Sequence, residues 1–325
     1  MILFIRNLLF VMLVVSLFLK SSEIFAEDSQ KRMIQTDLDP KYVRNKNYPE
    51  KWFRVLRTGI DTTREYLGNY GPLCVYIIGQ ENDELKSDSV AKGIIDAYCK
   101  NRHSESGNNL QGCLKGSGAS LITRAREGST EAYLSYVDFT PSPLSELVFI
   151  NPHGFPMPYL YTRGIHEYTH VYQRAFPSTP TWLTEGGAEF LAFYIGSEHK
   201  GINFEESMKE SMKMAKSVKK EEASLIDFED VGKIEKERPF LKKYYRHLAY
   251  DAGAWAVALL INRSESRSVK RFAKDFYPMV EKNGWRLAVS KYGNFKSIND
   301  FYSKFDLLLD TSFDEQIALL RSIKP

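Results

Sequence analysis

The spacing of hydrophobic and polar residues differs between the two halves of this chain. In the first half, helix-like intervals alternate with short apolar runs that are typical of buried strands. We expect helices over 49–69 and 81–101, and strands over 72–78, 120–125, 131–139 and 146–150. Polar residues at 27–45 predict an irregular lead-in, and the Ser-, Gly- and Asn-containing stretch 103–118 predicts a loop.

From about residue 160 onward, hydrophobic residues recur mostly at helical intervals. We expect helices over 161–175, 181–196, 202–220, 240–263, 266–279, 296–309 and 313–323. The apolar stripe of Met208, Met212 and Ala215 predicts core packing, whereas the charged stretch 216–243 predicts a solvated face or surface loop. The pattern indicates an α+β fold. We expect a mixed helix and small-sheet portion at 27–158, with an edge strand near 146–150, and a mainly helical portion at 159–325.

Residues 1–26 have the pattern of a secretory signal peptide. Arg6 precedes an apolar run from Leu8 to Leu19, and the small residue Ala26 precedes an acidic one. This run is shorter than the ~20 residues that a membrane-spanning helix needs. We therefore expect cleavage after Ala26, export to the periplasm or the extracellular space, and no stable membrane insertion afterwards. An uncleaved N-terminal anchor is the alternative interpretation.

Composition and charge argue against a nucleic-acid partner. The chain has 325 residues with 43% hydrophobic content, which is enough for a large buried core. Lys and Arg number 44 and Asp and Glu number 41, so the net charge is only +3. Without a basic excess or an aromatic–basic recognition motif, we expect no binding to nucleic acid.

The three cysteines of the expected mature chain lie in two different settings. Cys74 lies within the apolar run 72–78 and predicts a free thiol in the core. Cys99 and Cys113 flank the polar loop, and a disulfide between them, which export would permit, would hold that loop. Three free thiols are the alternative, and no cysteine pair has the spacing of a zinc site.

The candidate chemistry is concentrated at His166-Glu167-Tyr168-Thr169-His170, which has the pattern HExxH. On a helix, His166 and His170 project from one face one turn apart, so their imidazoles can bind one zinc ion. Glu167 lies beside them, where it can act on a water molecule at that ion. The alternative is two surface histidines on an unrelated helix, and the apolar neighbours Ile165 and Tyr172 argue against it.

A catalytic zinc site needs a third protein ligand and keeps one position open for water. Glu185 and Glu189 are the candidates, because they lie one turn apart on the next predicted helix. Fourteen residues (171–184) separate His170 from Glu185, and eighteen (171–188) separate it from Glu189. One carboxylate can bind the metal while the other accepts a hydrogen bond from a ligand histidine.

These elements resemble the gluzincins, zinc peptidases that take two His from HExxH and a Glu from a second helix. The stretch Trp182–Glu189 (WLTEGGAE) is similar to their W-L-x-E-G-x-A element. The resemblance implies a zincin-like helical portion with an active-site cleft between the two portions. It also implies one Zn²⁺ held by His166, His170 and Glu185, with Glu189 as the partner of a histidine. The eighteen-residue spacing of the aminopeptidase branch would instead select Glu189 as the ligand.

A second resemblance lies downstream. Tyr250–Gly253 is similar to the Y-x-x-G element of aminopeptidase-like gluzincins, in which the Tyr hydroxyl donates to the oxyanion. Tyr250 is therefore the candidate donor, and His247, three residues earlier, is its rival. The G-x-M-E-N element that holds a substrate's free amine is not present in the sequence. Further side chains that could meet a substrate are His153, Arg163 and Arg174.

The ligand pattern and the resemblance together predict a secreted zinc metallopeptidase with Glu167 as the general base and a peptide or protein as substrate. Three alternatives remain open. The chain could be a catalytically inactive zincin-like domain that binds a partner, or a zinc amidase that acts on a non-protein amide such as a cell-wall crosslink. It could also be a structural envelope protein in which HExxH is accidental.

Overall fold

A small mixed sheet is the framework of the first part of the chain. The computed structural model describes residues 32–80, 84–103, 107–137, 144–198 and 202–325, and the predicted signal peptide lies outside them. Within these residues the larger sheet has the order β2-β4-β6-β5. Its strands are β2 (Lys41–Arg44), β4 (Leu73–Ile78), β6 (Leu144–Ile150) and β5 (Glu131–Val137). β2, β4 and β6 are parallel, and β5 is antiparallel to β6, with Glu131 opposite Ile150.

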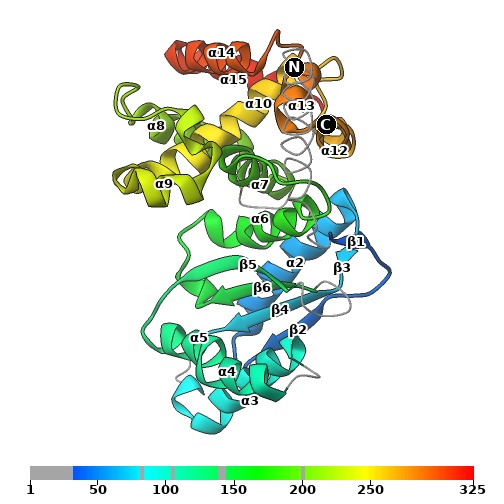
Figure 1. The fold of residues 1–325 in the computed structure, drawn as a ribbon, viewed down its shortest axis with the longest axis vertical. Coiled ribbons are helices and arrows are strands. Elements are labelled where there is room, and N and C mark those ends of the chain that lie inside the picture. Colours follow the sequence, from blue (N-terminus) through cyan, green and yellow to red (C-terminus); the bar gives the residue numbers. More distant parts are fainter. Residues whose placement is uncertain (1–31, 81–83, 104–106, 138–143, 199–201) are drawn as a thin grey trace, which may run out of the picture. The chain divides into compact units, whose positions relative to one another are not determined.

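Helices cover both faces of this sheet, as continuously apolar parallel strands require. Leu73, Val75 and Ile77 of β4 pack with residues of α2 (Glu50–Leu67) and α6 (Tyr159–Gln173). The alternate residues of the same strand pack against the other set of helices. That set consists of α3 (Asp88–Arg102), α4 (Gly107–Lys115) and α5 (Ser117–Arg126). The two helical layers lie on opposite sides of the sheet (Figure 1). A separate short pair joins β1 (Ile34–Gln35) to β3 (Tyr70–Gly71).

The rest of the described chain is helical. Its α-helices are α7 (Thr181–Gly196), α8 (Phe204–Lys216), α9 (Val231–Glu237), α10 (Gly253–Arg263), α11 (Val269–Arg271), α12 (Tyr277–Asn283), α13 (Trp285–Tyr292), α14 (Ile298–Asp310) and α15 (Phe313–Arg321). Every residue from Gly253 to Ile261 is buried, so α10 forms the centre of the helical core. A π-helical segment, Arg246–Ala252, leads directly into α10.

Two glycines allow α7 and the start of α10 to touch backbone to backbone. A Cβ atom on Gly186 would lie 2.2 Å from the carbonyl carbon of Gly253, and one on Gly253 would lie 2.4 Å from the carbonyl oxygen of Trp182. Both distances are far below any van der Waals contact, so only glycine fits at either position. This contact brings the end of the π-helical segment beside the first turns of α7.

Most predicted elements of the sheet and helical portions are present, and the mixed α+β architecture agrees with the prediction. Residues Arg32–Pro325 form one compact unit, in which α2 of the first portion packs against α6 of the second. The stripe of Met208, Met212 and Ala215 is buried in the core, which confirms the prediction made for it. Cys74 is a buried free thiol, as predicted.

Four local predictions were wrong. The lead-in at 27–45 contains β1 and β2, and β6 lies inside the sheet, so the edge strand is β5 rather than the strand near 146–150. The loop predicted at 103–118 is largely α4, and the strand predicted at 120–125 belongs to α5. A short apolar run such as this does not distinguish a strand from a buried helical turn.

Most charged side chains of the stretch 216–243 are exposed, as predicted for a solvated face. Apolar residues anchor this stretch, because Leu225, Phe228, Ile234 and Leu241 are buried in the helical core. Farther along, α13 was not predicted, and the helices expected at 240–263 and 266–279 are each interrupted by a π-helical segment.

A disulfide joins Cys99 of α3 to Cys113 of α4. It therefore links two helices on the face of the sheet opposite α2 and α6, rather than the ends of a loop.

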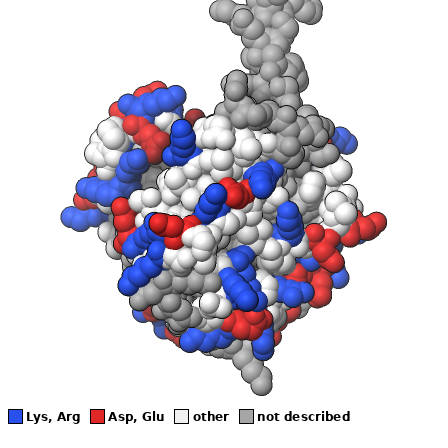
Figure 2. All heavy atoms as spheres, turned by 90° about the horizontal axis from the view of Figure 1, so that it is seen from below, with Lys and Arg blue, Asp and Glu red and all other residues white. Residues whose placement is uncertain are grey.

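Positive and negative side chains are interspersed among the described residues of the face seen in Figure 2. None of the described helices combines the length and apolar character that crossing a membrane requires.

The Gly186–Gly253 contact makes a prediction about stability. Replacing Gly253 with Ala places a methyl group within 2.4 Å of a backbone oxygen, so Gly253→Ala should lower the free energy of unfolding by about 1–3 kcal/mol or more. Gly93→Ala in α3 is the control, because its Cβ would meet nothing within 4 Å. That variant should be more stable by about 0.4–1 kcal/mol. Urea denaturation measures both, and equal effects would contradict the close contact.

Candidate metal centre

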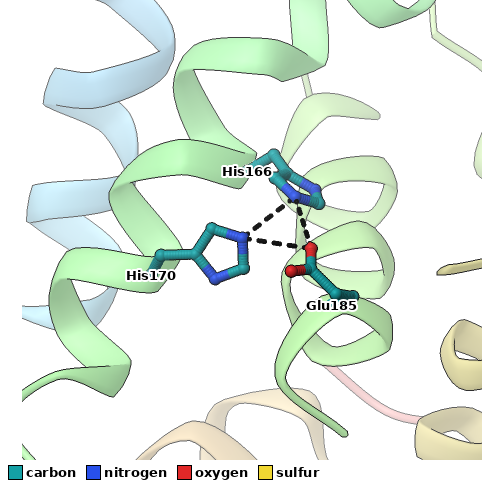
Figure 3. Close-up of side chains that lie close together, drawn as sticks. All are labelled: His166, His170 and Glu185. Carbon is teal, nitrogen blue, oxygen red and sulfur yellow. Dashed lines mark hydrogen bonds and ion pairs between the residues drawn. The ribbon is translucent and has the colours of Figure 1, made fainter. Parts of the chain in front are cut away.

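The HExxH residues lie on α6, which is packed between α2 and α7. The chain leaves β6 at Ile150, makes a short turn at Pro152–Gly154 and enters α6. Gly164 permits a close approach to α2, since a Cβ there would lie 2.4 Å from the carbonyl oxygen of Leu56. His166 and His170 lie one turn apart on the side of α6 that faces Glu185 of α7 (Figure 3).

Three potential ligand atoms converge between these two helices. The Nε2 atoms of His166 and His170 lie 3.1 Å apart. Glu185 Oε2 lies 3.5 Å from the first and 3.3 Å from the second. Among the described residues, this buried oxygen has no hydrogen-bond partner of acceptable geometry. The three side chains form a group that could hold a metal ion (Figure 3).

The hydrogen-bond partners of the two Nδ1 atoms determine which nitrogen of each imidazole carries the proton and which carries the lone pair. His166 Nδ1 lies 3.0 Å from Glu189 Oε2, and a carboxylate can only accept, so Nδ1 carries the proton. His170 Nδ1 lies 2.8 Å from Gln173 Oε1 and donates to it. In neutral imidazoles, both Nε2 lone pairs then point toward the Glu185 carboxylate. Such a cluster of acceptors is favourable only around a cation or a shared proton.

Gln173 is a site residue that the sequence analysis did not single out. Its Nε2 donates to the carbonyl oxygen of Thr184 at 3.0 Å and to the Tyr277 hydroxyl at 2.9 Å. Because the carbonyl oxygen can only accept, the orientation of the amide is determined, and Oε1 must face His170. A residue three positions after a ligand lies on the same helix face, so helical spacing could have identified Gln173.

Tyr245 is a second residue that was missed. Its hydroxyl donates to Glu185 Oε1 at 3.3 Å, which holds the oxygen of this carboxylate that does not face the histidines. Glu185 therefore has one oxygen bound to the protein and the other directed at the two Nε2 atoms. No motif in the sequence identifies Tyr245, because its role depends on how the segment before α10 crosses α7.

The protonation of the metal-free cluster follows from its charges. Burial opposes the charged form of His170, but the adjacent Glu185 carboxylate outweighs burial and raises the pKa of His170 to about 9. Burial likewise acts to raise the pKa of Glu185, yet His170 and His166 hold it well below its ordinary value. In the absence of a metal, His170 and Glu185 thus form an ion pair at neutral pH.

The Glu189 carboxylate is not part of the converging group of His166, His170 and Glu185. It lies behind His166 and has no exposed surface. Arg246 donates to its Oε1, and Arg163 lies 3.6 Å from its Oε2. Burial acts to raise the pKa of Glu189, but Arg246, His166 and Arg163 together keep it below its ordinary value. Glu189 is therefore an ionised carboxylate that orients His166, while Glu185 belongs to the converging group.

A pocket of about 350 Å³ opens directly onto this cluster. Its walls include both histidines, Glu185, Glu167 and Tyr250, and part of β5 forms the opposite side. The ring of Tyr250 is stacked on that of His166, with centroids 5.5 Å apart. Burial, and after it Glu185, Tyr245 and Glu167, raises the pKa of Tyr250, so its hydroxyl stays protonated and available as a donor.

The other residues proposed for substrate contact have different positions. Arg174 lines the pocket, but neither His247 nor His153 is part of its wall. His247 Nδ1 is buried without a hydrogen-bond partner among the described residues, and His153 lies against the Tyr48 hydroxyl at 3.2 Å. Arg163 lies behind the ligands, 3.8 Å from Glu167. Of the two rival donors, only Tyr250 shares the pocket with the histidines.

The arrangement defines a class of site, in which two neutral imidazoles and one carboxylate can hold a metal next to a second carboxylate and a phenol. Such a site can bind a metal, accept a proton and donate a hydrogen bond within one pocket. No protein-family model matches this chain, and no curated protein or solved structure is significantly similar to it. Its own residues and their geometry therefore carry the functional argument.

The ion pair between His170 and Glu185 predicts how the metal-free protein responds to pH. The pKa of His170 is raised from 6.5 to about 9, so the stability from this pair is complete below about pH 6.5 and is lost as the pH rises through about 9. After chelation, the free energy of unfolding should fall from about pH 6 to about pH 9.5. His170→Gln should show a smaller fall over the same range. Equal slopes in urea titrations of both proteins would refute the ion pair.

Proposed function

We propose that this chain is an exported, zinc-dependent metallopeptidase with one Zn²⁺ held by His166, His170 and Glu185. The observation that carries the proposal is the convergence of two imidazole Nε2 atoms and a carboxylate oxygen at a pocket. Nitrogen and carboxylate oxygen are ligands that zinc accepts, and a set of three leaves a position for water.

The separations of the donor atoms are compatible with a tetrahedral zinc ion. Two ligands at about 2.0–2.1 Å from a tetrahedral ion lie about 3.3 Å from each other. The three separations here are 3.1, 3.3 and 3.5 Å. Glu189 and Gln173, which hold the Nδ1 atoms, supply the outer hydrogen bonds that ligand histidines usually make.

Within this proposal, bound zinc supplies Lewis acidity, which lowers the pKa of a water molecule from 15.7 to about 7 and polarises a carbonyl group. Glu167 accepts a proton from the attacking water and later donates it to the leaving nitrogen. The Tyr250 hydroxyl donates a hydrogen bond to the carbonyl oxygen as that oxygen gains negative charge. Both side chains line the pocket that holds the ligands.

The edge of the sheet suggests how a peptide would be held. Among the described strands, β5 pairs only with β6, so its other edge offers unpaired backbone groups. Ala132, Tyr133 and Leu134 of this strand line the same pocket as the ligands. An extended peptide that adds to β5 would receive backbone hydrogen bonds there and pass the candidate metal centre. This geometry favours a peptide or protein substrate.

The proposed location outside the cytosol is compatible with the Cys99–Cys113 disulfide, because such bonds persist in oxidising compartments. The predicted signal peptide at 1–26 remains a sequence-based expectation. Together they support the proposal of a location in the periplasm or the extracellular space.

Substitution of the general base tests the proposed reaction. Glu167→Gln removes the proton acceptor but none of the ligands, so kcat should fall by about 10²–10⁴-fold while about one zinc per chain remains bound. Fluorescently labelled casein and elemental analysis supply the two measurements. Glu206→Gln, on the exposed side of α8, is the control and should behave like the wild type.

The same experiment separates the alternatives. A wild-type protein that holds zinc but cleaves no peptide would indicate an inactive binding domain or an amidase, and cell-wall fragments would then be screened as substrates. A wild-type protein without zinc, or a Glu167→Gln variant with full activity, would refute the proposal.

The proposed oxyanion donor is tested by comparing two neighbours on the same segment. Tyr250→Phe removes only a hydroxyl from the pocket, so kcat should fall by about 10²–10³-fold with little change in KM. His247→Gln, outside the pocket wall, should leave kcat within about twofold, since it removes no group from the site. If the two variants show the reverse order of effects, the donor is His247 and not Tyr250.

A further inference from the structure

The carboxylate behind His166 depends on its own charged neighbours. Glu189 is fully buried, and its Oε2 accepts the hydrogen bond from His166 Nδ1. A buried carboxylate without a paired cation is strongly unfavourable and would protonate or move. The side chain that compensates the charge of Glu189 therefore also controls the orientation of a candidate metal ligand.

Arg246 makes the direct contact with this carboxylate. One of its guanidinium nitrogens donates to Glu189 Oε1, the oxygen that His166 does not use. Arg163, the other cation nearby, stays 3.6 Å from Glu189 and 3.8 Å from Glu167. Arg163 thus lies between two carboxylates without a hydrogen bond to either, whereas Arg246 is bonded to one of them.

Aromatic rings hold the Arg246 guanidinium in place. Its central carbon lies 4.9 Å from the ring centroid of Tyr159 and 4.7 Å from that of Tyr250. Such contacts between a cation and aromatic faces are favourable and limit the freedom of a long side chain. Tyr250 is in turn stacked on His166, so the arginine and the imidazole lie next to the same ring.

The π-helical segment brings two further groups of its own next to this arginine. In a π-helix the hydrogen bond runs from residue i to i+5, and residues four and five positions apart lie near one another. Arg246 accordingly contacts Tyr250 and also lies 3.6 Å from the buried Asp251. A π-helical turn within a helix is often found at a functional site.

We propose that Arg246 is a positioning residue for His166, acting through the Glu189 carboxylate that it binds. The inference rests on the proposed function only in that His166 is taken to be a metal ligand. Removing Arg246 leaves Glu189 without a bonded cation, so the carboxylate no longer holds His166 with Nε2 directed at Glu185. The measurable consequence is weaker metal binding, whether or not the protein cleaves peptides.

Zinc affinity, measured by competition with a chromophoric chelator, tests this role. Arg246→Gln should weaken zinc binding by about 10–100-fold, the usual effect of losing an outer hydrogen bond of a ligand histidine. Arg246→Lys keeps the positive charge but not the planar guanidinium that contacts the two rings, so it should bind zinc more tightly than Arg246→Gln and less tightly than the wild type. Arg238→Gln is the matched control, because Arg238 pairs with Asp227 outside this network, and it should bind zinc like the wild type.

A double-mutant comparison distinguishes action through Glu189 from a general structural effect. In a Glu189→Gln background, Arg246→Gln should cause at most about a twofold further loss of zinc affinity, because the carboxylate through which it acts is gone. The double variant also leaves no unpaired charge at Glu189, so it serves if Arg246→Gln alone does not fold. A further tenfold loss in that background would overturn the inference, as would wild-type affinity in a folded Arg246→Gln protein.

The outcomes for the two proposals can be told apart. If zinc affinity responds to Arg246 as expected but casein is not cleaved, the positioning role stands and the peptidase proposal fails. If the wild type cleaves casein and binds zinc while the Arg246 variants bind it equally well, the peptidase proposal stands and the positioning role fails. A wild-type protein without zinc affinity refutes both.

Discussion

The backbone contact between Gly186 and Gly253 is the constraint on which the site depends. It joins the helix that carries Glu185 and Glu189 to the segment that carries Tyr245, Arg246 and Tyr250. With larger residues at either position the two helices would stand apart, and the second segment would no longer reach the first. The glycines of the two resemblance motifs are therefore packing partners of each other, which gives both motifs a structural reason beyond the chemistry beside them.

The site built on this contact consists of polar groups in successive layers. The inner layer is a group of lone pairs that favours a cation, and the next layer contains Glu189 and Gln173, which fix the two imidazoles. A third layer, with Arg246 on one side and Tyr277 on the other, holds those partners in turn. Each layer makes hydrogen bonds to the polar atoms of the layer inside it. The protein's own contacts therefore orient the candidate ligands in the absence of a metal.

Sequence patterns predicted the centre of this arrangement better than its surroundings. Helical spacing within HExxH identified His166 and His170 as neighbours on one face. Spacing left Glu185 and Glu189 as rivals, and only the resemblance of Trp182–Glu189 to the gluzincin element favoured Glu185, which the structure places with the histidines. Tyr245 and Arg246 were not identified, because their roles arise from contacts between segments distant in the sequence. Gln173 was also missed, although its position three residues after His170 on the same helix could have identified it. In the first portion, α5 was taken for a strand and β6 for an edge, because burial of short apolar runs and the order of strands are settled by tertiary packing.

The π-helical segment has a consequence for how the length of the chain can vary. The connection between α6 and α7 carries no ligand, although several of its residues line the pocket. Additional residues there would change the pocket wall and the spacing between His170 and Glu185, but both ligands would stay on their helices. The segment between Arg246 and Ala252 is sensitive to a change of length, because a π-helical turn differs from an α-helical one by a single residue. Deleting one residue there would restore an ordinary helix and rotate the preceding side chains by about 100° relative to α10. Insertions and deletions should therefore be tolerated more readily in the connection between α6 and α7 than in the π-helical segment.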